Sequence, residues 1–448
     1  MGPAAEPRSV PGVHDPAAPV RPAARLEVGV VTLSDARDRT RHPRGSAGRR
    51  RDLAPHPRTT VRGIDEDAYW EYLGSSAHAG YQQSPQWGRA RSGDWDPELV
   101  GWYDADDRLV GVALLRSRSL PVVRRRFAMM AQGPVIDWEH GDLPDLLAAL
   151  EAYARGHGIF ALVVVPSLAL RVWGPTGVKA ALADPEVTKW SQVTSDREDP
   201  VGHRAVQALA AAGWHRLPQD GMLDASQPLF TFWIPLGGRT KEEVLAGMTR
   251  AWRKNIRKAE REDVVVIDGT REDLPTVQRL YAETAARQGF SVQPLEYFES
   301  MWDALAGDQP GTFHLHLALH EGDVLAANGT ARAGGHAQGV FAARGDLRRQ
   351  LKAANALYAE IIHGAIAEGA DQLDIGGVAE TLEADGPEAG LLVFKADMGG
   401  EVREGIGGWE LVLSPLLHAG FTRLLPLYGR IRHLADAGLR RPMRRSRS

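Results

Sequence analysis

One lysine of this sequence, Lys395, stands where a cation could act on a substrate. The apolar run 391–394 before it reads as a strand, and the glycine pair 399–400 follows it closely. In an extended segment successive side chains point to opposite sides, so Phe394 would pack inward while the Lys395 ammonium faces a cleft. A surface lysine at a strand end is the simpler interpretation of any single lysine. The surrounding sequence, including Asp374 and the glycine pair 376–377 upstream, has to decide.

A second group of cations lies on one side of a predicted helix. Thr240 and Glu243 have the spacing of a capping box, and apolar residues at 245, 248, 252, 256 and 259 then share one face at about 100° per residue. The cations of the opposite face are Arg250, Arg253, Lys254, Arg257, Lys258 and Arg261. A solvated charged face and a phosphate-binding surface that contacts RNA explain this pattern about equally well.

The sequence lacks the signatures of several other chemistries. It has no glycine-rich phosphate loop ending in Lys-Ser or Lys-Thr, no Gly-x-Gly-x-x-Gly motif and no serine in a Gly-x-Ser-x-Gly elbow. Because the chain has no cysteine, thiolate metal sites and thiol nucleophiles are excluded. His314, His316 and His320 lack carboxylates at metal-ligand spacing, so we expect no metal and no cofactor.

Length and charge set broader bounds. The 448 residues are too many for one ordinary core, which indicates two domains. The net charge of −4 hides arginine clusters at 41–51, 116–126, 250–261 and 440–447, so partners that carry phosphate fit this chain. No apolar window of about 18 residues could cross a membrane, and the start lacks the apolar core of a secretory signal. We therefore expect a cytoplasmic protein.

The two halves of the sequence repeat one order of elements. Strands predicted at 99–103, 109–116 and 127–136 precede a helix at 143–153 and a strand at 159–165. The second half has strands at 315–319, 324–332 and 338–343, a helix at 351–368 and a strand at 372–375. This indicates a duplicated α/β unit, in the order found in acyltransferases of the GNAT type.

The composition suggests where the domains begin and end. Residues 1–60 are rich in Pro, Ala, Arg and Gly and are predicted to be a disordered arm. We expect a first GNAT-like domain at 61–225 and a second at 226–400. We expect the segment 401–432 to pack back on the first domain and 433–448 to be a basic tail. The apolar and basic residues of these last segments fit peripheral contact with an anionic membrane surface.

The segment at the start of the helix 351–368 bears on the acyl donor. A GNAT acetyltransferase has Arg/Gln-x-x-Gly-x-Gly/Ala here, and its backbone amides bind the coenzyme A pyrophosphate. This sequence has Leu351 where the first glycine is needed. A leucine side chain would block close approach of the backbone, so the sequence predicts the fold without the acyl-CoA donor.

Several ordered motifs together resemble one family. They are Trp87-Gly88-Arg89-Ala90-Arg91, Gly133-Pro134-Val135-Ile136-Asp137, Arg253-Lys254-Asn255-Ile256-Arg257-Lys258-Ala259, Asp374-Ile375-Gly376-Gly377, and Phe394-Lys395 with Gly399-Gly400-Glu401-Val402. The sequence from about residue 81 to 428 is similar to the FemX/FemA/FemB family of peptidoglycan-bridge aminoacyltransferases. The resemblance implies an α/β fold of two tandem GNAT-like domains with mixed sheets flanked by helices. Because residues 264–267 follow the basic helix almost at once, the coiled-coil insert of some members is absent.

The resemblance also implies roles for particular residues. Lys395 matches the family lysine held to stabilise the tetrahedral intermediate, and Phe394 matches its partner. Arg91 stands where many members have a lysine that contacts the phosphate of the precursor, and Arg287 or Arg257 matches a second phosphate-binding arginine. The other residues expected to bind substrate are Trp87, Tyr358 and Asp374. Two departures affect the precursor contacts, because Gln132 replaces a frequent arginine and 164–167 lacks the usual acidic residues.

The function implied by the resemblance is transfer of an amino acid from aminoacyl-tRNA to the stem-peptide amine of a cell-wall precursor, either lipid II or a UDP-linked muropeptide. Glycine is the first candidate for the amino acid, followed by alanine and serine. The implied location is cytoplasmic, with peripheral contact at the inner face of the plasma membrane. Two alternatives stay open at this point: an acyl-CoA-dependent N-acyltransferase of the same fold, and a non-catalytic protein that binds nucleic acid.

Overall fold

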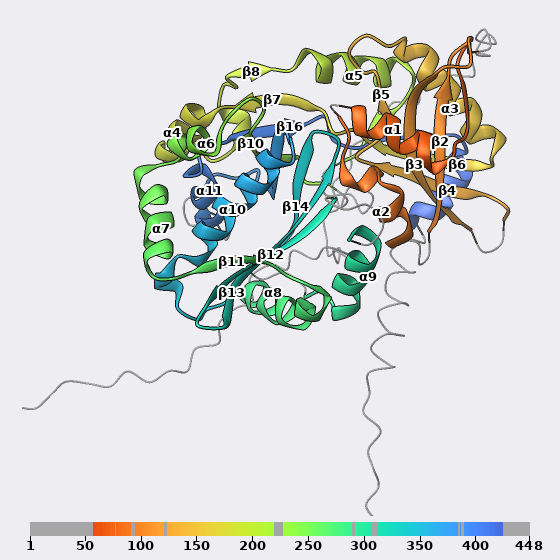
Figure 1. Ribbon diagram of the computed structural model, residues 1–448. Coiled ribbons are helices and arrows are strands. Elements are labelled where there is room, and N and C mark those ends of the chain that lie inside the picture. The colour runs from red at the N-terminus through yellow and green to blue at the C-terminus, as the bar shows by residue number, and fades with distance from the viewer. Residues whose placement is uncertain are drawn as a thin grey trace, which may run out of the picture.

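Two mixed β-sheets with flanking helices form the molecule (Figure 1). The computed structural model describes residues 57–423 apart from 77, 91–94, 121–122, 219–226, 289–291, 307–311, 384–385 and 387–388. The first sheet, drawn at the right of Figure 1 with α1 and α3, is formed mainly by the first half of the chain. The second sheet, with α8 and α10, lies at the left and centre.

The first sheet has the strand order β1-β2-β3-β4-β6-β17-β9, and β5 pairs with β3. Its strands are β1 (Thr60–Gly63), β2 (Asp96–Tyr103), β3 (Leu109–Ser119), β4 (Arg126–Ala131), β5 (Val135–Ile136), β6 (Ile159–Val165), β9 (His215–Arg216) and β17 (Trp409–Val412). The helices around it are α1 (Glu66–Ser75), α2 (Pro85–Ala90), α3 (Leu143–Gly156) and α5 (Pro200–Ala211). Only β4 and β6 pair in parallel, and the other pairs are antiparallel.

The second sheet has the order β11-β12-β13-β14-β15-β10-β16-β7-β8. Its strands are β7 (Ala169–Trp173), β8 (Arg197–Glu198), β10 (Phe230–Pro235), β11 (Val265–Asp268), β12 (Phe313–His320), β13 (Asp323–Ala333), β14 (His336–Arg344), β15 (Gln372–Gly377) and β16 (Glu401–Gly405). Its helices are α4 (Pro175–Ala183), α6 (Lys241–Gly247), α7 (Arg250–Arg261), α8 (Leu274–Gln288), α9 (Leu295–Leu305), α10 (Ala353–Ala367) and α11 (Ala389–Ala396). Short 3₁₀ helices are η1 (Tyr81–Gln83), η2 (Trp190–Gln192), η3 (Arg271–Asp273) and η4 (Arg349–Leu351).

Apolar residues on both faces of the second sheet explain why helices cover both. On one face Ala318, Leu325 and Ala326 pack with residues of α7, α10 and α11. On the other face Phe313 and Phe341, together with their neighbours, pack with α8 and α9. β14 and β15 pair in parallel only over 336–338 and 372–374, after which no further pairs join them. The two strands therefore separate on the side where the candidate site lies.

The predicted fold class is confirmed, because each half contributes a mixed sheet with helices in the expected order. Sheet membership does not follow the expected division at residue 225, however. β7 and β8 come before that point but join the second sheet through β16, while β17 from the end of the chain pairs with β6 in the first sheet. The two halves therefore exchange strands. Since α7 is followed directly by β11, no coiled coil is inserted between them.

Three predicted boundaries are corrected by the structure. Ordered chain begins before residue 61, because the Arg58 and Thr59 amides donate to Asp145 and Thr60 pairs with Tyr103. The strand predicted at 127–136 divides into β4 and β5, since Gln132 adopts a left-handed φ of 55°. The helix predicted from the capping box at Thr240 also divides. The backbone is extended at 248 and 249, and Thr249 then caps a second helix, α7.

Candidate active site

Lys395 lies on a helix, which corrects the predicted strand. The buried residues of α11 are Leu392, Lys395 and Ala396, at the three- and four-residue spacing of one helix face. A short apolar run can form either a buried strand or a buried helix, and here packing selects the helix. Lys395 is 5% exposed, and its Nζ donates to the Gly376 carbonyl at 3.1 Å and the Gly377 carbonyl at 2.7 Å. The ammonium is therefore held against the end of β15 by two carbonyls of that strand and does not itself project from a strand end.

The end of β15 beside Lys395 depends on a glycine. Gly376 has φ of +89°, a conformation that side chains with a Cβ rarely adopt. A Cβ built at this position would lie 3.8 Å from the Lys395 Nζ. The conformation directs the carbonyls of 376 and 377 toward the ammonium, so the glycine pair noted in the sequence shapes the lysine's surroundings.

Aromatic residues fix the other side of α11. The Trp252 indole N–H donates to the Phe394 carbonyl at 3.1 Å, and the two rings lie 5.1 Å apart. The Tyr358 ring lies 6.0 Å from that of Phe394, and burial raises the pKa of Tyr358 to about 12. Tyr358 is 8% exposed and its hydroxyl contacts Asn328. It therefore supports Phe394 from the core side and stays neutral at physiological pH.

Asp374 connects the end of β15 to Gln132 in the first half of the molecule through a chain of hydrogen bonds. Its Oδ1 accepts the Gly376 N–H at 2.7 Å, and its Oδ2 accepts the Gln338 amide at 3.0 Å. The Gln338 Oε1 in turn accepts the Gln132 amide at 2.7 Å. Burial raises the pKa of Asp374 to about 6, against the hydrogen bond from Gly376 and the positive charges of Lys395 and Arg403. The carboxyl is therefore ionised near neutral pH although it is 3% exposed.

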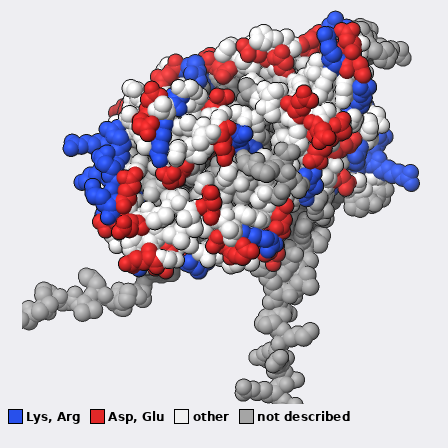
Figure 2. Space-filling model, viewed as in Figure 1, with Lys and Arg blue, Asp and Glu red and all other residues white. Residues whose placement is uncertain are grey.

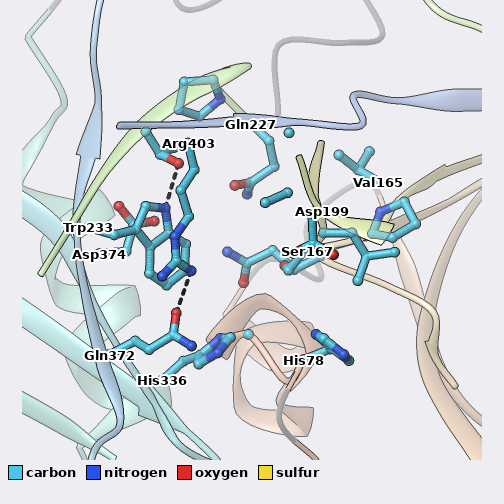
Figure 3. Close-up of a pocket in the computed structure, with 18 of the residues that line it drawn as sticks. His78, Val165, Ser167, Asp199, Gln227, Trp233, His336, Gln372, Asp374 and Arg403 are labelled. Carbon is cyan, nitrogen blue, oxygen red and sulfur yellow. Dashed lines mark hydrogen bonds between the residues drawn. The ribbon is translucent and has the colours of Figure 1, made fainter. Parts of the chain in front are cut away.

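A cavity of about 250 Å³ opens beside Asp374, between residues that belong to the two sheets (Figure 3). We call it the interdomain cavity. Its wall residues include His78, Gln132, Ser167, Asp199, Gln227, Thr231, Trp233, His336, Gln338, Gln372, Asp374 and Arg403. Arg403 lies over the Trp233 ring at 4.5 Å from its centre and pairs with Glu401 at 2.6 Å. Burial, together with the charge of Arg403, lowers the pKa of His336 to about 4, so this histidine is neutral.

Two further cavities have wall residues close to Lys395. One, of about 450 Å³, is lined by Gly377, by residues 378–381 and by Leu391. The other, of about 160 Å³, lies beside Phe394, and we call it the arginine cavity because Arg344, Arg348 and Arg349 line it. Lys395 lines none of these three cavities, but each has a wall residue close to it: Asp374, Phe394 or Gly377. A fixed ammonium close to a bound substrate can stabilise negative charge on a carbonyl oxygen.

The predicted cationic stripe forms part of the surface of α7, at the left of Figures 1 and 2. Arg250, Lys254, Arg257 and Arg261 are exposed, whereas Arg253 and Lys258 are half-buried. The Arg253 guanidinium donates to the Ala246 carbonyl at 2.6 Å and to the Met248 carbonyl at 2.7 Å. Arg253 therefore caps the C-terminal end of α6, while the four exposed cations face solvent.

The remaining predicted substrate residues are not gathered in one place. Trp87 is 5% exposed and packs edge-on against Tyr81 at 5.1 Å. The Arg287 guanidinium donates to the Arg344 carbonyl at 2.6 Å and pairs with Asp346 at 3.1 Å. Arg287 thus supports the wall of the arginine cavity and is not among the residues that line the interdomain cavity. Arg91 lies outside the described residues.

Some wall residues were not predicted from the sequence. Trp233 and Thr231 alternate with buried residues along β10, which has the pattern expected when one side of a strand faces a cavity. Arg403 follows the glycine-containing motif at 399–402 by one position and could have been considered with it. Gln338 carried no sequence signal, because its role depends on contact with Gln132, 206 residues away.

Comparisons with known proteins found a matching family, two relatives and a solved structure of similar fold. A sequence model of the FemAB family matches residues 64–318 and 321–425. The lipid II:glycine glycyltransferase of Staphylococcus saprophyticus is 26% identical over 254 residues, covering 55% of this chain and 52% of the relative. The protein of that name from Staphylococcus aureus is 27% identical over 220 residues, covering 47% and 45%. The chain thus matches about half the length of these relatives. The crystal structure of FemX has the same fold, with a TM-score of 0.67 and 19% identity over 81% of this chain and 99% of that one.

Proposed function

This chain belongs to the FemAB family, and from that premise we propose that it transfers glycine from aminoacyl-tRNA to the stem-peptide amine of lipid II. The observation that carries the proposal is the buried ammonium of Lys395, held by two backbone carbonyls close to wall residues of three cavities. Burying a cation costs free energy, and groups held at such a cost cluster at functional sites. The relatives named lipid II:glycine glycyltransferases support the choice of donor amino acid and acceptor.

The proposed reaction is aminolysis of an ester. The acceptor amine attacks the carbonyl carbon of the aminoacyl ester, forming the new C–N bond and placing negative charge on the carbonyl oxygen. The Lys395 ammonium stabilises this oxyanion. The C–O bond to the terminal ribose then breaks, and the proton lost by the amine ends on the ribose oxygen, carried by groups of the substrate itself. No additional oxidant, reductant or cofactor enters this balance.

We assign the two substrates to different parts of the surface according to the chemistry of each part. Around the interdomain cavity, amide side chains and neutral histidines suit the peptide of an acceptor, and the ionised Asp374 attracts an amine. The exposed cations of α7 suit the phosphates of RNA. Alanine or serine in place of glycine, and a UDP-linked muropeptide in place of lipid II, are the variations within this proposal.

The test is single-turnover transfer with a panel of charged tRNAs and with lipid- and UDP-linked precursors. We expect product with glycyl-tRNA and lipid II that depends on both substrates. Product from an acyl-coenzyme A, with none from any charged tRNA, would replace the proposal with the acyl-CoA alternative. One observation favours keeping that alternative in the assay. The Leu351 side chain is 6% exposed and packs in the core, so it does not block the neighbouring backbone as the sequence suggested.

Peripheral membrane contact is a separate part of the proposal. No helix within the described ranges is both long and apolar enough to span a bilayer. The basic residues of 433–448 lie outside those ranges, and their charge would attract an anionic surface. Co-sedimentation with anionic vesicles, for the whole chain and for a chain ending at residue 432, tests this contact. Equal binding by the two chains would contradict it.

A further inference from the structure

The arginine cavity lies where β14 turns into α10, and its charge is uneven. Four of its wall residues are cationic, Arg344, Arg348, Arg349 and Lys352, whereas Asp397 is the one carboxylate among them. Trp252 and Asn255 of α7 form the opposite wall, and Phe394 lies at one end. The cavity therefore joins the helix that carries the cationic stripe to the residue that precedes Lys395.

Only part of this positive charge is neutralised by neighbouring residues. Arg348 pairs with Glu321 at 2.9 Å and with Asp323 at 3.4 Å. Arg349 lies 3.9 Å from the Asp346 carboxylate, which pairs more closely with Arg287. In the part of the chain that the structure describes, neither the Arg344 guanidinium nor the Lys352 ammonium makes a hydrogen bond or ion pair. Two cations are thus left to face the cavity.

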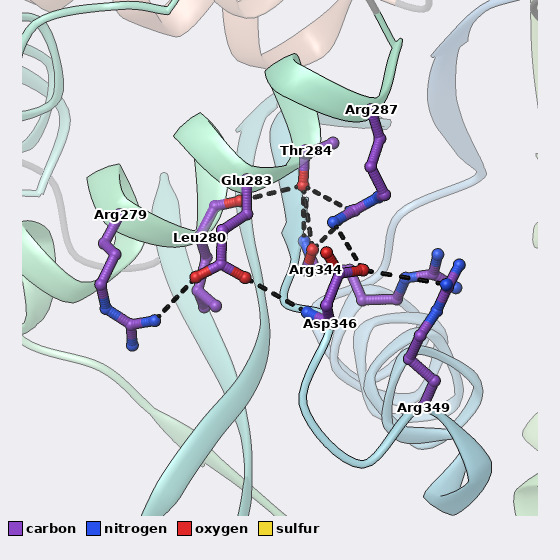
Figure 4. Close-up of polar contacts among 8 residues, drawn as sticks. All are labelled: Arg279, Leu280, Glu283, Thr284, Arg287, Arg344, Asp346 and Arg349. Atoms are coloured by element: carbon purple, nitrogen blue, oxygen red, sulfur yellow. Dashed lines mark hydrogen bonds and ion pairs between the residues drawn. The ribbon is translucent and has the colours of Figure 1, made fainter. Parts of the chain in front are cut away.

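Neighbouring arginines, Arg287 and Arg349, lie near Arg344 (Figure 4), and their repulsion also indicates that the cavity favours an anion. Burial lowers the pKa of Arg344, and the nearby charges of Arg349 and Arg287 lower it further, against the attraction of Asp346. Like charges gathered in a half-buried position are unfavourable unless an anion joins them. An anionic group in the cavity would remove this repulsion.

The cavity wall is held in place by contacts that leave Arg344 available. The Thr284 hydroxyl and the Arg287 guanidinium both donate to the Arg344 carbonyl, at 3.1 and 2.6 Å. Glu283 accepts the Asp346 N–H at 3.2 Å. Lys352 adopts a left-handed φ of 63° immediately before α10, and the start of this helix has no side-chain cap. The arrangement is therefore formed before any ligand arrives.

We propose that the arginine cavity binds a phosphodiester group near the 3′ end of the RNA strand that carries the amino acid. This inference rests on the proposed function and deepens it, because it assigns a position to the end of the donor. RNA bound along the exposed face of α7 would enter the cavity beside Asn255, a half-buried wall residue of that helix, and its terminal ester would then lie beyond Phe394, next to Lys395. The cavity would thus fix the reacting end, while α7 supplies attraction that does not depend on that end.

A phosphate of coenzyme A has the same chemistry and could occupy the same cavity. The buried position of Leu351 removes the steric argument against it. The two sources differ in what else they need, because RNA requires the exposed cations of α7 and coenzyme A does not.

The test compares two uncharged RNA hairpins, one with a single-stranded 3′ CCA end and one blunt. The protein variant is Arg344→Gln with Lys352→Gln. Its matched control is Arg271→Gln with Arg279→Gln, since both arginines are exposed, both pair with carboxylates, and neither lines the cavity. Affinity is measured by fluorescence anisotropy over a range of salt concentrations, with thermal melting to confirm folding.

We expect the cavity variant to lose at least about tenfold in affinity for the CCA hairpin, because charge-assisted contacts to phosphate are lost. Its salt dependence should fall by about 0.7 for each single-strand phosphate contact removed. Its affinity for the blunt hairpin should match that of the wild type. Equal losses for the two hairpins, or no loss for either, would overturn the proposal. A parallel variant, Lys254→Gln with Arg257→Gln, should weaken both hairpins alike.

The remaining results separate this inference from the function on which it rests. Wild-type protein that binds the CCA hairpin and transfers glycine, together with a cavity variant of unchanged affinity, would refute the cavity site and leave the proposed function standing. Wild-type protein that binds neither hairpin would refute both. Binding of coenzyme A that is lost in the cavity variant but unaffected by the α7 variant would assign the cavity to coenzyme A and overturn the RNA assignment.

Discussion

The interdomain cavity, which Asp374 lines, and the arginine cavity, which Phe394 lines, are built from different chemistry. The wall of the interdomain cavity includes four glutamines and two histidines, and its cations, Arg197 and Arg403, both lie near the Glu401 carboxylate, at 3.9 and 2.6 Å. In the arginine cavity the cations outnumber the carboxylates, and Arg344 is left without a paired carboxylate among the described residues. One cavity therefore suits a neutral or amine-bearing peptide, and the other suits phosphate.

Under the proposed function, the difference between the two cavities would let one lysine act on two unlike substrates, a peptide amine and an RNA-linked ester. A carbonyl that develops negative charge needs a nearby cation, but a mobile, exposed cation would be attracted to phosphate. Two backbone carbonyls hold the Lys395 ammonium in a buried position, whereas Arg250, Lys254, Arg257 and Arg261 of α7 are exposed. Under the proposed function, position more than charge would distinguish the catalytic cation from those that attract RNA.

The largest expected effect tests whether Lys395 acts in catalysis and not only in binding at one of the cavities. We expect Lys395→Met to reduce single-turnover transfer by about 10²- to 10³-fold at saturating substrates, as for loss of one oxyanion donor. The variant also leaves two buried carbonyls without this donor, at a cost of about 1–3 kcal/mol for each group left unsatisfied, so melting is measured alongside. Lys241→Met is the control, because Lys241 is a half-buried lysine of the same half that pairs with Glu360. Transfer that falls only in proportion to the unfolded fraction would give Lys395 a structural role.

The second prediction concerns RNA attraction by the exposed cations. For Lys254→Glu with Arg257→Glu we expect the slope of log affinity against log salt to fall by about 2, since roughly 0.9 is lost for each duplex phosphate contact. Arg253 is excluded from this pair because it caps α6. Arg62→Glu with Arg108→Glu, two exposed arginines of the first half, should leave the slope unchanged. If the α7 pair also leaves the slope unchanged, the stripe is only a solvated face.

The smallest effect tests whether burial beside the interdomain cavity raises the pKa of Asp374. The pKa of Asp374 is raised to about 6 in the folded protein, above its unfolded value, so the folded state binds more protons between these values. Stability from this group is therefore greatest at low pH and falls as pH rises toward 6. We expect the difference in unfolding free energy between wild type and Asp374→Asn to change by about 1–2 kcal/mol between pH 5 and 7.5. Urea unfolding across this range measures it, and a constant difference would show that Asp374 is not perturbed.

Much of the fold could be predicted because its signals are local. β6 was predicted at its observed bounds, and the capping box at Thr240 formed as expected. The apolar side of α7 is buried at Trp252, Ile256 and Ala259, as the helical spacing indicated. Prediction failed where the backbone had to change direction, at Gln132 and at 248–249, since the sequence there continues an apolar pattern across the break.

The sequence by itself determined the duplicated order of strands and helices and the cationic stripe, and it singled out Lys395 as a candidate. These follow from periodicity and from motifs read along the chain. Tertiary structure alone decided that residues 389–396 form a helix, because an apolar run of that length acquires its form from what it packs against. It also decided the exchange of strands between the sheets and the contact of Gln132 with Gln338. Each of these depends on residues distant in sequence, so no local pattern could have specified them.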